Sequence, residues 1–107
     1  MFGVTTPKRL SSMPNIPTLD EQGLKGFDVR VWHGIYAPKG TPPAVIEKLN
    51  VALRAALQDD MVKHRLAELS SEIVPLDKQT PESLRTHLAA EVEKWGRVIG
   101  AAGVQAA

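Results

Sequence analysis

Proline positions decide where this chain can form helices. Proline fixes its own φ angle and lacks an amide proton, so Pro14 and Pro17, three residues apart, exclude a regular helix from residues 8–18. Pro42 and Pro81 each follow a threonine, and a threonine N-cap ahead of a proline at the first helical position is a common helix start. The pattern therefore predicts a loop in the first part of the chain and helices that begin near these two later prolines.

Apolar residues recur at three- and four-residue steps in three segments, which is the spacing of one helix face. We expect helices over residues 43–58, 60–69 and 81–102, so helix should exceed strand. Trp95, on the last of these helices, is expected to be a largely buried core anchor. Its expected neighbours are Leu88, Val92 and either Leu49 or Leu53.

Residues 27–36 alternate between two faces as a β-strand does. One face holds four apolar residues and His33 and is expected to meet a core. The other combines charge, aromatic rings and Gly34, which suits lining a ligand cleft or packing against another domain, and both readings stay open. A short edge strand is expected near 72–75, and Thr18 is expected to cap a single helical turn. The two predicted faces are Phe27, Val29, Val31, His33 and Ile35, and Asp28, Arg30, Trp32, Gly34 and Tyr36.

The balance of charges limits the classes of partner. Thirteen Lys and Arg stand against twelve Asp and Glu, a net charge of +1, so no basic excess favours nucleic acid as a partner. Apolar residues make up 43%, which argues against disorder, and 107 residues allow one domain at most. No apolar run approaches the ~20 residues of a membrane span. The first nine residues hold no signal-peptide core, so the chain as it stands is expected in the cytoplasm, unless residue 1 is not the natural start.

No residue pattern typical of catalysis or metal binding is present in the sequence. Cysteine is absent, which removes disulfides, thiolate metal sites and cysteine nucleophiles. The histidines are His33, His64 and His87, and no two of them are three or four residues apart. Neither Ser11-Ser12 nor Ser70-Ser71 lies in the G-x-S-x-G motif of a serine nucleophile. Phosphate-binding glycine motifs are absent too. We therefore expect no metal, no cofactor and no enzymatic activity, in an α/β piece whose function these patterns alone do not name.

Several motifs in a fixed order resemble one protein family over essentially the whole chain. They are Pro14-Asn15-Ile16-Pro17-Thr18, Gly23-Leu24-Lys25-Gly26-Phe27, Val31-Trp32-His33-Gly34, Ala37-Pro38-Lys39-Gly40-Thr41-Pro42 and Glu93-Lys94-Trp95-Gly96-Arg97-Val98-Ile99. They resemble the Bug family, the TctC-like substrate-binding proteins of tripartite tricarboxylate transporters. Within that family, the chain is similar to the C-terminal third only.

The resemblance implies a fold and a division of the chain. Family members are two-domain receptors with a periplasmic-binding-protein-like fold, so this chain is expected to be an α/β C-terminal fragment, helix-rich with a short sheet. Residues 1–26 would be the tail end of domain 2 with a loop. Residues 27–37 would be the hinge-crossing strand, and residues 38–107 the C-terminal helical part of domain 1. The signal peptide, the opening strands of domain 1 and most of domain 2 would lie outside this sequence.

The resemblance also implies a site. A two-lobed receptor encloses its ligand between its domains, and strands that cross the hinge form the floor of that cleft. Trp32, His33 and Gly34 would therefore line the ligand cleft. Arg30 has the side chain to clamp a carboxylate bidentately, but the family does not usually carry a basic residue there, so we leave it out of the site.

Two functions follow for the chain. The first is part of a periplasmic solute receptor that binds small organic carboxylates and presents them to the membrane subunits of a tripartite tricarboxylate transporter. The second is a truncated, self-associating interaction module without solute binding. It follows because an unpaired strand edge and an uncovered apolar face favour pairing with another copy. We expect the fragment to form a homodimer.

Overall fold

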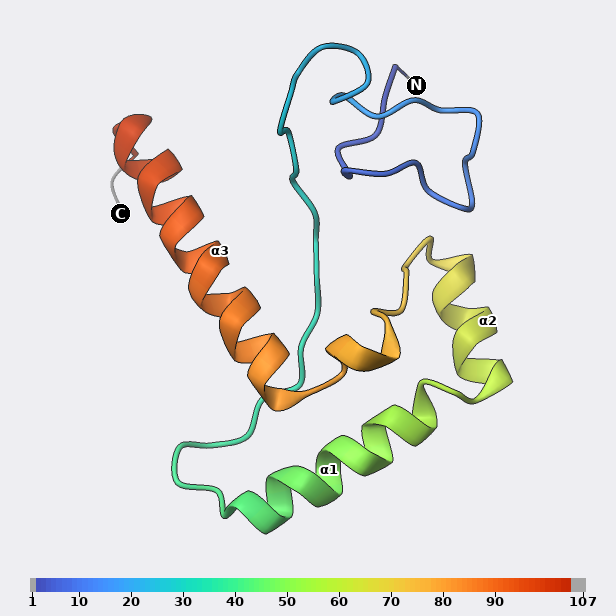
Figure 1. Ribbon diagram of the computed structural model, residues 1–107, viewed down its shortest axis with the longest axis vertical. Helices are drawn as coiled ribbons and strands as arrows, with labels where there is room; N and C mark the ends of the chain where they lie inside the picture. Colours follow the sequence, from blue (N-terminus) through green and yellow to red (C-terminus); the bar gives the residue numbers. More distant parts are fainter. Residues whose placement is uncertain (1, 105–107) are drawn as a thin grey trace. The chain divides into compact units, whose positions relative to one another are not determined.

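Three α-helices and one short 3-10 helix make up the regular structure of residues 2–104. The computed structural model describes residues 2–104, and Figure 1 gives the order of the elements along the chain. These are α1 (Pro43–Ala56), α2 (Asp60–Glu68), the 3-10 helix η1 (Leu76–Lys78) and α3 (Pro81–Ala101). The three helices predicted from apolar spacing are confirmed, and their ends lie within two residues of the predicted ends. No helix in the described part of the chain is both long enough and apolar enough to span a bilayer.

The two predicted helix starts differ in how they are capped. At α3, the hydroxyl oxygen of Thr80 accepts a hydrogen bond from the amide of Ser83 at 3.1 Å, which confirms Thr80 as the N-cap. At α1, the prediction that Thr41 is the N-cap is wrong, because the helix begins one residue later. Pro43 is the first helical residue, so Pro42 occupies the cap position without a side-chain hydrogen bond. The hydroxyl of Thr41 instead donates to the carbonyl three residues before it, at 2.7 Å.

Two compact units divide the chain, and each is described by itself. The first unit contains the chain up to Tyr36 together with Asp60–Ile73, and the second contains Ala37–Asp59 together with the chain from Val74 onward. This division neither tests nor replaces the domain assignment predicted for a whole receptor, because it groups only the residues present here.

Val4 and Thr18 form the buried centre of the first unit. They pair in an isolated parallel bridge, and their exposed fractions are 7% and 1%. The amide of Val4 donates to the carbonyl of Pro17 at 3.0 Å, and the carbonyl of Val4 accepts from the amide of Leu19 at 2.9 Å. Val4 is the only buried apolar side chain among the described residues. Hydrogen bonds, more than an apolar core, therefore hold this unit together.

The predicted strands have no ladder within the described residues. Residues 27–38 form an extended segment without regular secondary structure (Figure 1), and residues 71–75 are irregular as well. A β-strand exists only beside a partner strand. Both strands therefore stay predictions for a chain that has such partners.

Gln79 is the buried centre of the second unit, with 7% of its surface exposed. Its side-chain amide donates to the backbone carbonyl of Val74 at 2.8 Å, and its backbone carbonyl accepts from the side-chain amide of Asn50 at 3.1 Å. These bonds connect α1 with the turn that precedes α3. The expected burial of Trp95 is wrong for this chain, because Trp95 is 37% exposed and α1 and α3 do not pack against each other along their lengths.

Candidate functional site

Trp32, His33 and Gly34 lie in the middle of the extended segment, residues 27–38. Trp32 and Gly34 are half-buried, whereas His33 is exposed. Their neighbours Val31 and Ile35, which were expected against a core, are 88% and 71% exposed. That expectation is wrong for this chain, because no element in the described part of its unit covers that face.

Short hydrogen bonds position the start of this segment. The amide of Val29 donates to the carbonyl of Thr5 at 3.0 Å. The Arg30 guanidinium donates to both carboxylate oxygens of Asp28, at 2.7 and 2.9 Å. This bidentate pair holds the guanidinium beside its own segment, and leaving Arg30 out of the site stays a prediction.

The proline–threonine motif before this segment forms a capping box. The amide of Glu21 donates to the Thr18 hydroxyl oxygen at 3.0 Å, and the amide of Thr18 donates to Oε2 of Glu21 at 2.7 Å. The expectation that Thr18 caps a turn is thus confirmed. Thr18, which helps to carry the family resemblance, therefore has a structural role here.

Arg9 joins this capping box, which the sequence did not reveal. Its Nε lies 3.0 and 3.2 Å from the two carboxylate oxygens of Glu21, and its Nη1 donates to the carbonyl of Pro14 at 3.2 Å. The hydrogen bond from Arg9, helped by the Thr18 amide, lowers the pKa of the Glu21 carboxyl. No local signal predicts this contact, because the two partners are twelve residues apart in the sequence.

A second turn leads directly into the segment. Oδ1 of Asp20 accepts a hydrogen bond from the amide of Gly26 at 2.7 Å, and its Oδ2 lies 3.3 Å from the Lys25 ammonium. The bond from the Gly26 amide and then the one from Lys25 lower the pKa of Asp20. Gly26 has a φ of +75°, which favours glycine, so the glycine of this motif sets the direction in which the chain enters the segment.

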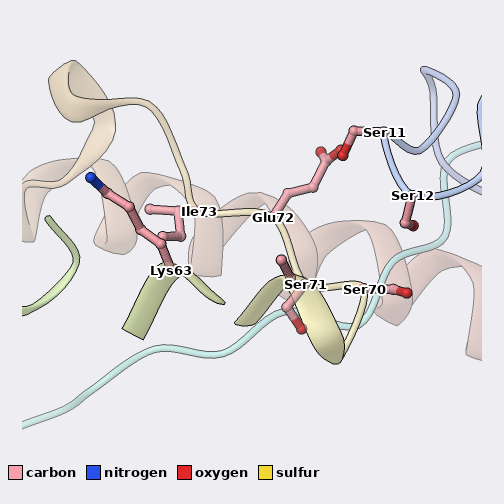
Figure 2. A pocket seen from close by; sticks show the side chains of 8 residues that line it. Ser11, Ser12, Lys63, Ser70, Ser71, Glu72 and Ile73 are labelled. Carbon is pink, nitrogen blue, oxygen red and sulfur yellow. The ribbon is translucent and has the colours of Figure 1, made fainter. Parts of the chain in front are cut away.

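A hollow of about 510 Å³ in the first unit does not include the predicted site residues. Figure 2 shows that the Lys63 ammonium points away from the serines, and Lys63 lies 3.7 Å from Asp60. The polar side chains that line the hollow are exposed and do not converge on a common point, so the hollow lacks the arrangement of a small-molecule site. The lining residues are Ser11, Ser12, Lys63, Ala67, Ser70, Ser71, Glu72 and Ile73.

Metal-ligand geometry is not found in the described part of the chain. Across residues 2–104, no three His, Asp or Glu side chains come close enough together to hold a metal ion. His64 lies 3.3 Å from Glu68, one helical turn further along α2, in an exposed pair.

Solved structures with the same backbone arrangement define the class of protein. The chain is similar to the structure described as periplasmic binding protein BugD, with 40% identity and a TM-score of 0.82. The similarity covers 96% of this chain and 34% of that one. It is also similar to R. palustris Rpa4515, solved with adipate, with 32% identity and a TM-score of 0.76, over 94% of this chain and 33% of the other. The fold is therefore that of part of a periplasmic binding protein.

Sequence relatives identify the family. The profile of the tripartite tricarboxylate transporter family receptor matches residues 1–104, so the chain belongs to this family. A UPF0065 protein from the TAR-I ttuE-ttuC' intergenic region of Agrobacterium vitis is 45% identical over 95% of this chain and 30% of its own length. Protein BugT of Bordetella pertussis is 30% identical over 97% of this chain and 31% of its own. The chain thus spans about a third of these relatives, and the predicted family resemblance is confirmed.

Proposed function

We propose that this chain forms part of a periplasmic solute receptor that binds small organic carboxylates for a tripartite tricarboxylate transporter. The observation that carries the proposal is the similarity of almost the whole chain to BugD and to the adipate-bound Rpa4515. Adipate is a dicarboxylate, so a relative that shares this part of the fold was solved with a ligand of the proposed class. Because the chain spans about a third of both structures, solute binding would belong to the longer receptor.

In this proposal the chain contributes one wall of the ligand cleft. Residues 1–26 end domain 2, residues 27–37 cross the hinge, and residues 38–107 form the C-terminal helical part of domain 1. Trp32, His33 and Gly34 then line the cleft. Indole and imidazole N–H groups can donate to a carboxylate, and glycine lets a ligand come close to the backbone.

The proposed receptor works by binding and delivery. It captures the carboxylate in the periplasm and presents it to the membrane subunits of the transporter, without changing the ligand chemically. Binding needs no metal and no cofactor, because hydrogen-bond donors are enough to hold a carboxylate.

The test uses a joined receptor in which residues 1–107 replace the matching third of BugD. Titration calorimetry with adipate and other small mono- and dicarboxylates should give saturable binding by at least one of them. Trp32→Ala should weaken that binding at least about tenfold, because it removes a polar aromatic from the cleft. Leu24→Ala, in the turn before the segment, is the matched control and should leave the dissociation constant within about twofold. No saturable heat with any carboxylate, or equal binding by the two variants, would refute the proposal.

Residues 1–107 alone should bind the same carboxylates poorly. A cleft between two lobes needs both lobes, and this chain supplies about a third of the length of its relatives. Calorimetry on the chain alone should therefore show no saturable heat below millimolar ligand. A micromolar dissociation constant would contradict the two-lobed cleft and place the complete site within this chain.

The exposed apolar side chains favour a second candidate function, a truncated self-associating module that binds no solute. Val92, Val98 and Ile99 on α3 are 65%, 49% and 46% exposed, and burial of such surface drives pairing. In this case the chain forms a homodimer. Sedimentation equilibrium from micromolar to submillimolar concentration tests it, and a monomer mass over the whole range would exclude it.

A further inference from the structure

Two neighbouring carboxylates hold the turn that precedes the extended segment. We call it the 18–26 turn, after its residues. At its start, Glu21 accepts a hydrogen bond from the amide of Thr18, and at its end Asp20 accepts one from the amide of Gly26, both at 2.7 Å. Hydrogen bonds from backbone amides to charged carboxylates are among the stronger ones in proteins. Side chains of the turn itself therefore fix both of its ends.

Backbone hydrogen bonds close the same turn further. The amide of Gly23 donates to the carbonyl of Asp20 at 3.2 Å, and the amide of Leu24 donates to the carbonyl of Leu19 at 3.0 Å. The amide of Phe27, the first residue of the extended segment, donates to the carbonyl of Leu24 at 3.1 Å. The direction in which the chain leaves the turn is therefore set by local hydrogen bonds.

The start of the extended segment is also tied to the buried centre of its unit. The amide of Val29 donates to the carbonyl of Thr5, and Thr5 follows Val4, which pairs with Thr18 in the parallel bridge. Thr18 is 1% exposed and begins the 18–26 turn. The turn, the bridge and the start of the segment thus form one hydrogen-bonded arrangement. Trp32 lies three residues beyond Val29 in the sequence.

The hydrogen bond from Asp20 holds the turn at the point where packing does not. Gly26 has a φ of +75°, and in the described part of the chain no atom other than those of its neighbours in sequence lies within 4 Å of where its Cβ would be. Steric contact therefore leaves this residue free to rotate, and Oδ1 of Asp20 restrains it.

A small rotation at Gly26 displaces Trp32 by a large distance. An extended chain advances ~3.3 Å per residue, so the six residues from Gly26 to Trp32 span roughly 20 Å. A rotation of about 10° would displace the far end of that length by ~3 Å. Side chains of a binding site must be held to within ~0.5 Å of their productive positions. The bond between Asp20 and Gly26 is therefore placed to control the position of the indole.

We infer that Asp20 is a positioning residue for carboxylate binding and that it acts through Trp32. Its carboxylate holds the Gly26 amide and so sets where the segment places the indole in the ligand cleft. The inference rests on the proposed function, in which Trp32 lines that cleft. It adds a residue that controls affinity without contacting the ligand.

The acceptor oxygen of Asp20 matters more here than its charge. Its Oδ2 lies 3.3 Å from the Lys25 ammonium, but the Lys25 side chain is 77% exposed, and exposed ion pairs contribute little. Asp20→Asn keeps an oxygen that can accept from the Gly26 amide, whereas Asp20→Ala removes it. Lys25→Ala removes the ion pair and leaves the amide bond in place. These three variants separate the hydrogen bond from the charge.

The experiment measures binding of adipate and of the other carboxylates of the panel by the joined receptor, with titration calorimetry. Asp20→Ala should raise the dissociation constant at least about fivefold, because the indole is no longer held in position. Asp20→Asn and Lys25→Ala should each stay within about twofold of the unchanged receptor.

A double variant tests whether Asp20 acts through Trp32. When Trp32→Ala is already present, Asp20→Ala should change the dissociation constant by no more than about twofold, because the ring that it positions is gone. Thr80→Ala is the control for loss of stability, since it removes the cap of α3 in the other unit. It should leave the affinity unchanged with and without the Trp32 indole.

Fluorine NMR of the joined receptor, labelled with 5-fluorotryptophan, provides a measurement that needs no ligand. The resonance of Trp32 is assigned by its loss in Trp32→Phe, and that of Trp95 by its loss in Trp95→Phe. Asp20→Ala should shift or broaden the Trp32 resonance, whereas Asp20→Asn should leave it in place. The Trp95 resonance should be the same in both variants.

Three results would overturn the inference. One is an affinity of Asp20→Ala within about twofold of the unchanged receptor. Another is an equal loss of affinity in Asp20→Asn, which would assign the effect to the charge. The third is an equal further loss from Asp20→Ala with and without the Trp32 indole, which would indicate general destabilisation.

The failure of this inference differs from the failure of the proposed function. A joined receptor whose carboxylate binding depends on Trp32 but not on Asp20 overturns the positioning role alone. A joined receptor that binds no carboxylate, while Asp20→Ala still shifts the Trp32 resonance, overturns the proposed function and leaves the placement of Trp32 by Asp20 standing.

Discussion

At the scale of single residues, a side chain at Gly3 would have to displace its neighbours. A Cβ atom there would lie 2.5 Å from Nε2 of Gln22, 2.9 Å from Cδ2 of Leu19 and 3.3 Å from the carbonyl oxygen of Pro17. The Gln22 amide would have to move, and it would then lose its 2.7 Å hydrogen bond to the carbonyl of Phe2. Gly3→Ala should therefore lower the free energy of unfolding of the joined receptor by about 1–3 kcal/mol.

Gly96→Ala is the matched control for this change. Position 96 lies within α3 and has open space around it, so alanine should raise stability by about 0.5–1 kcal/mol. Urea denaturation of both variants provides the measurement. If the two changes had the same sign, the close approach at Gly3 would not control stability.

The carboxyl of Glu21 should titrate below its ordinary pKa of 4.5, because Arg9 and the Thr18 amide stabilise its charged form. The folded chain then binds this proton less tightly than the unfolded chain does. The interaction therefore contributes stability above pH ~4.5, and that contribution is lost as the pH falls through the lowered pKa.

Carbon-13 NMR of the Glu21 carboxyl in residues 1–107 measures this titration. Arg9→Gln removes the charge and the contact of Nε with both carboxylate oxygens, so the pKa of Glu21 should move up toward its ordinary value. The bond from the Thr18 amide should keep it somewhat lowered. An identical pKa with and without the Arg9 guanidinium would contradict the assignment of Arg9 to this capping box.

At the scale of elements, the caps of α1 and α3 give a paired prediction. Thr80 caps α3 through its hydroxyl, so Thr80→Ala should cost about 1 kcal/mol of stability. Thr41 does not cap α1, and Thr41→Ala should change stability by no more than about 0.5 kcal/mol. Urea denaturation of the joined receptor, with helix content followed by circular dichroism, compares the two. Equal losses would mean that Thr41 supports its helix as Thr80 does.

Helices and caps were predictable here because their signals are local. Apolar spacing located α1, α2 and α3, and the threonine before Pro81 located a true cap. The same rule failed at Thr41 because two consecutive prolines move the helix start by one residue. A strand at 27–36 cannot be judged in the same way, because its hydrogen bonds must come from another strand.

At the scale of the whole molecule, the long-range contacts were not predictable. The pairing of Arg9 with Glu21 joins residues far apart in sequence, and the exposure of Trp95 depends on what lies outside its own helix. A periodic apolar stripe indicates that one face of a helix packs against another element, but it does not identify that element. The site residues Trp32, His33 and Gly34 were named from the family resemblance, and their role stays a prediction.

The small apolar core leads to a calorimetric prediction for the chain taken alone. Val4 is the only buried apolar side chain in residues 2–104, whereas unfolding heat comes largely from the disruption of packed interiors. A compact domain of ~100 residues absorbs about 70 kcal/mol on unfolding near 60 °C. Residues 1–107 alone should absorb well under half of that in a broad transition. The joined receptor should show a sharp transition whose enthalpy rises with the full chain length.

Differential scanning calorimetry at two protein concentrations separates the possible outcomes. If the chain alone gives a small, broad transition at both concentrations, its helices are held mainly by local hydrogen bonds such as those of Thr80 and Gln79. A sharp transition whose midpoint rises with concentration would mean that pairing between copies supplies the missing core. A sharp transition of about 70 kcal/mol that is independent of concentration would contradict the prediction, because one copy would then bury a core of its own.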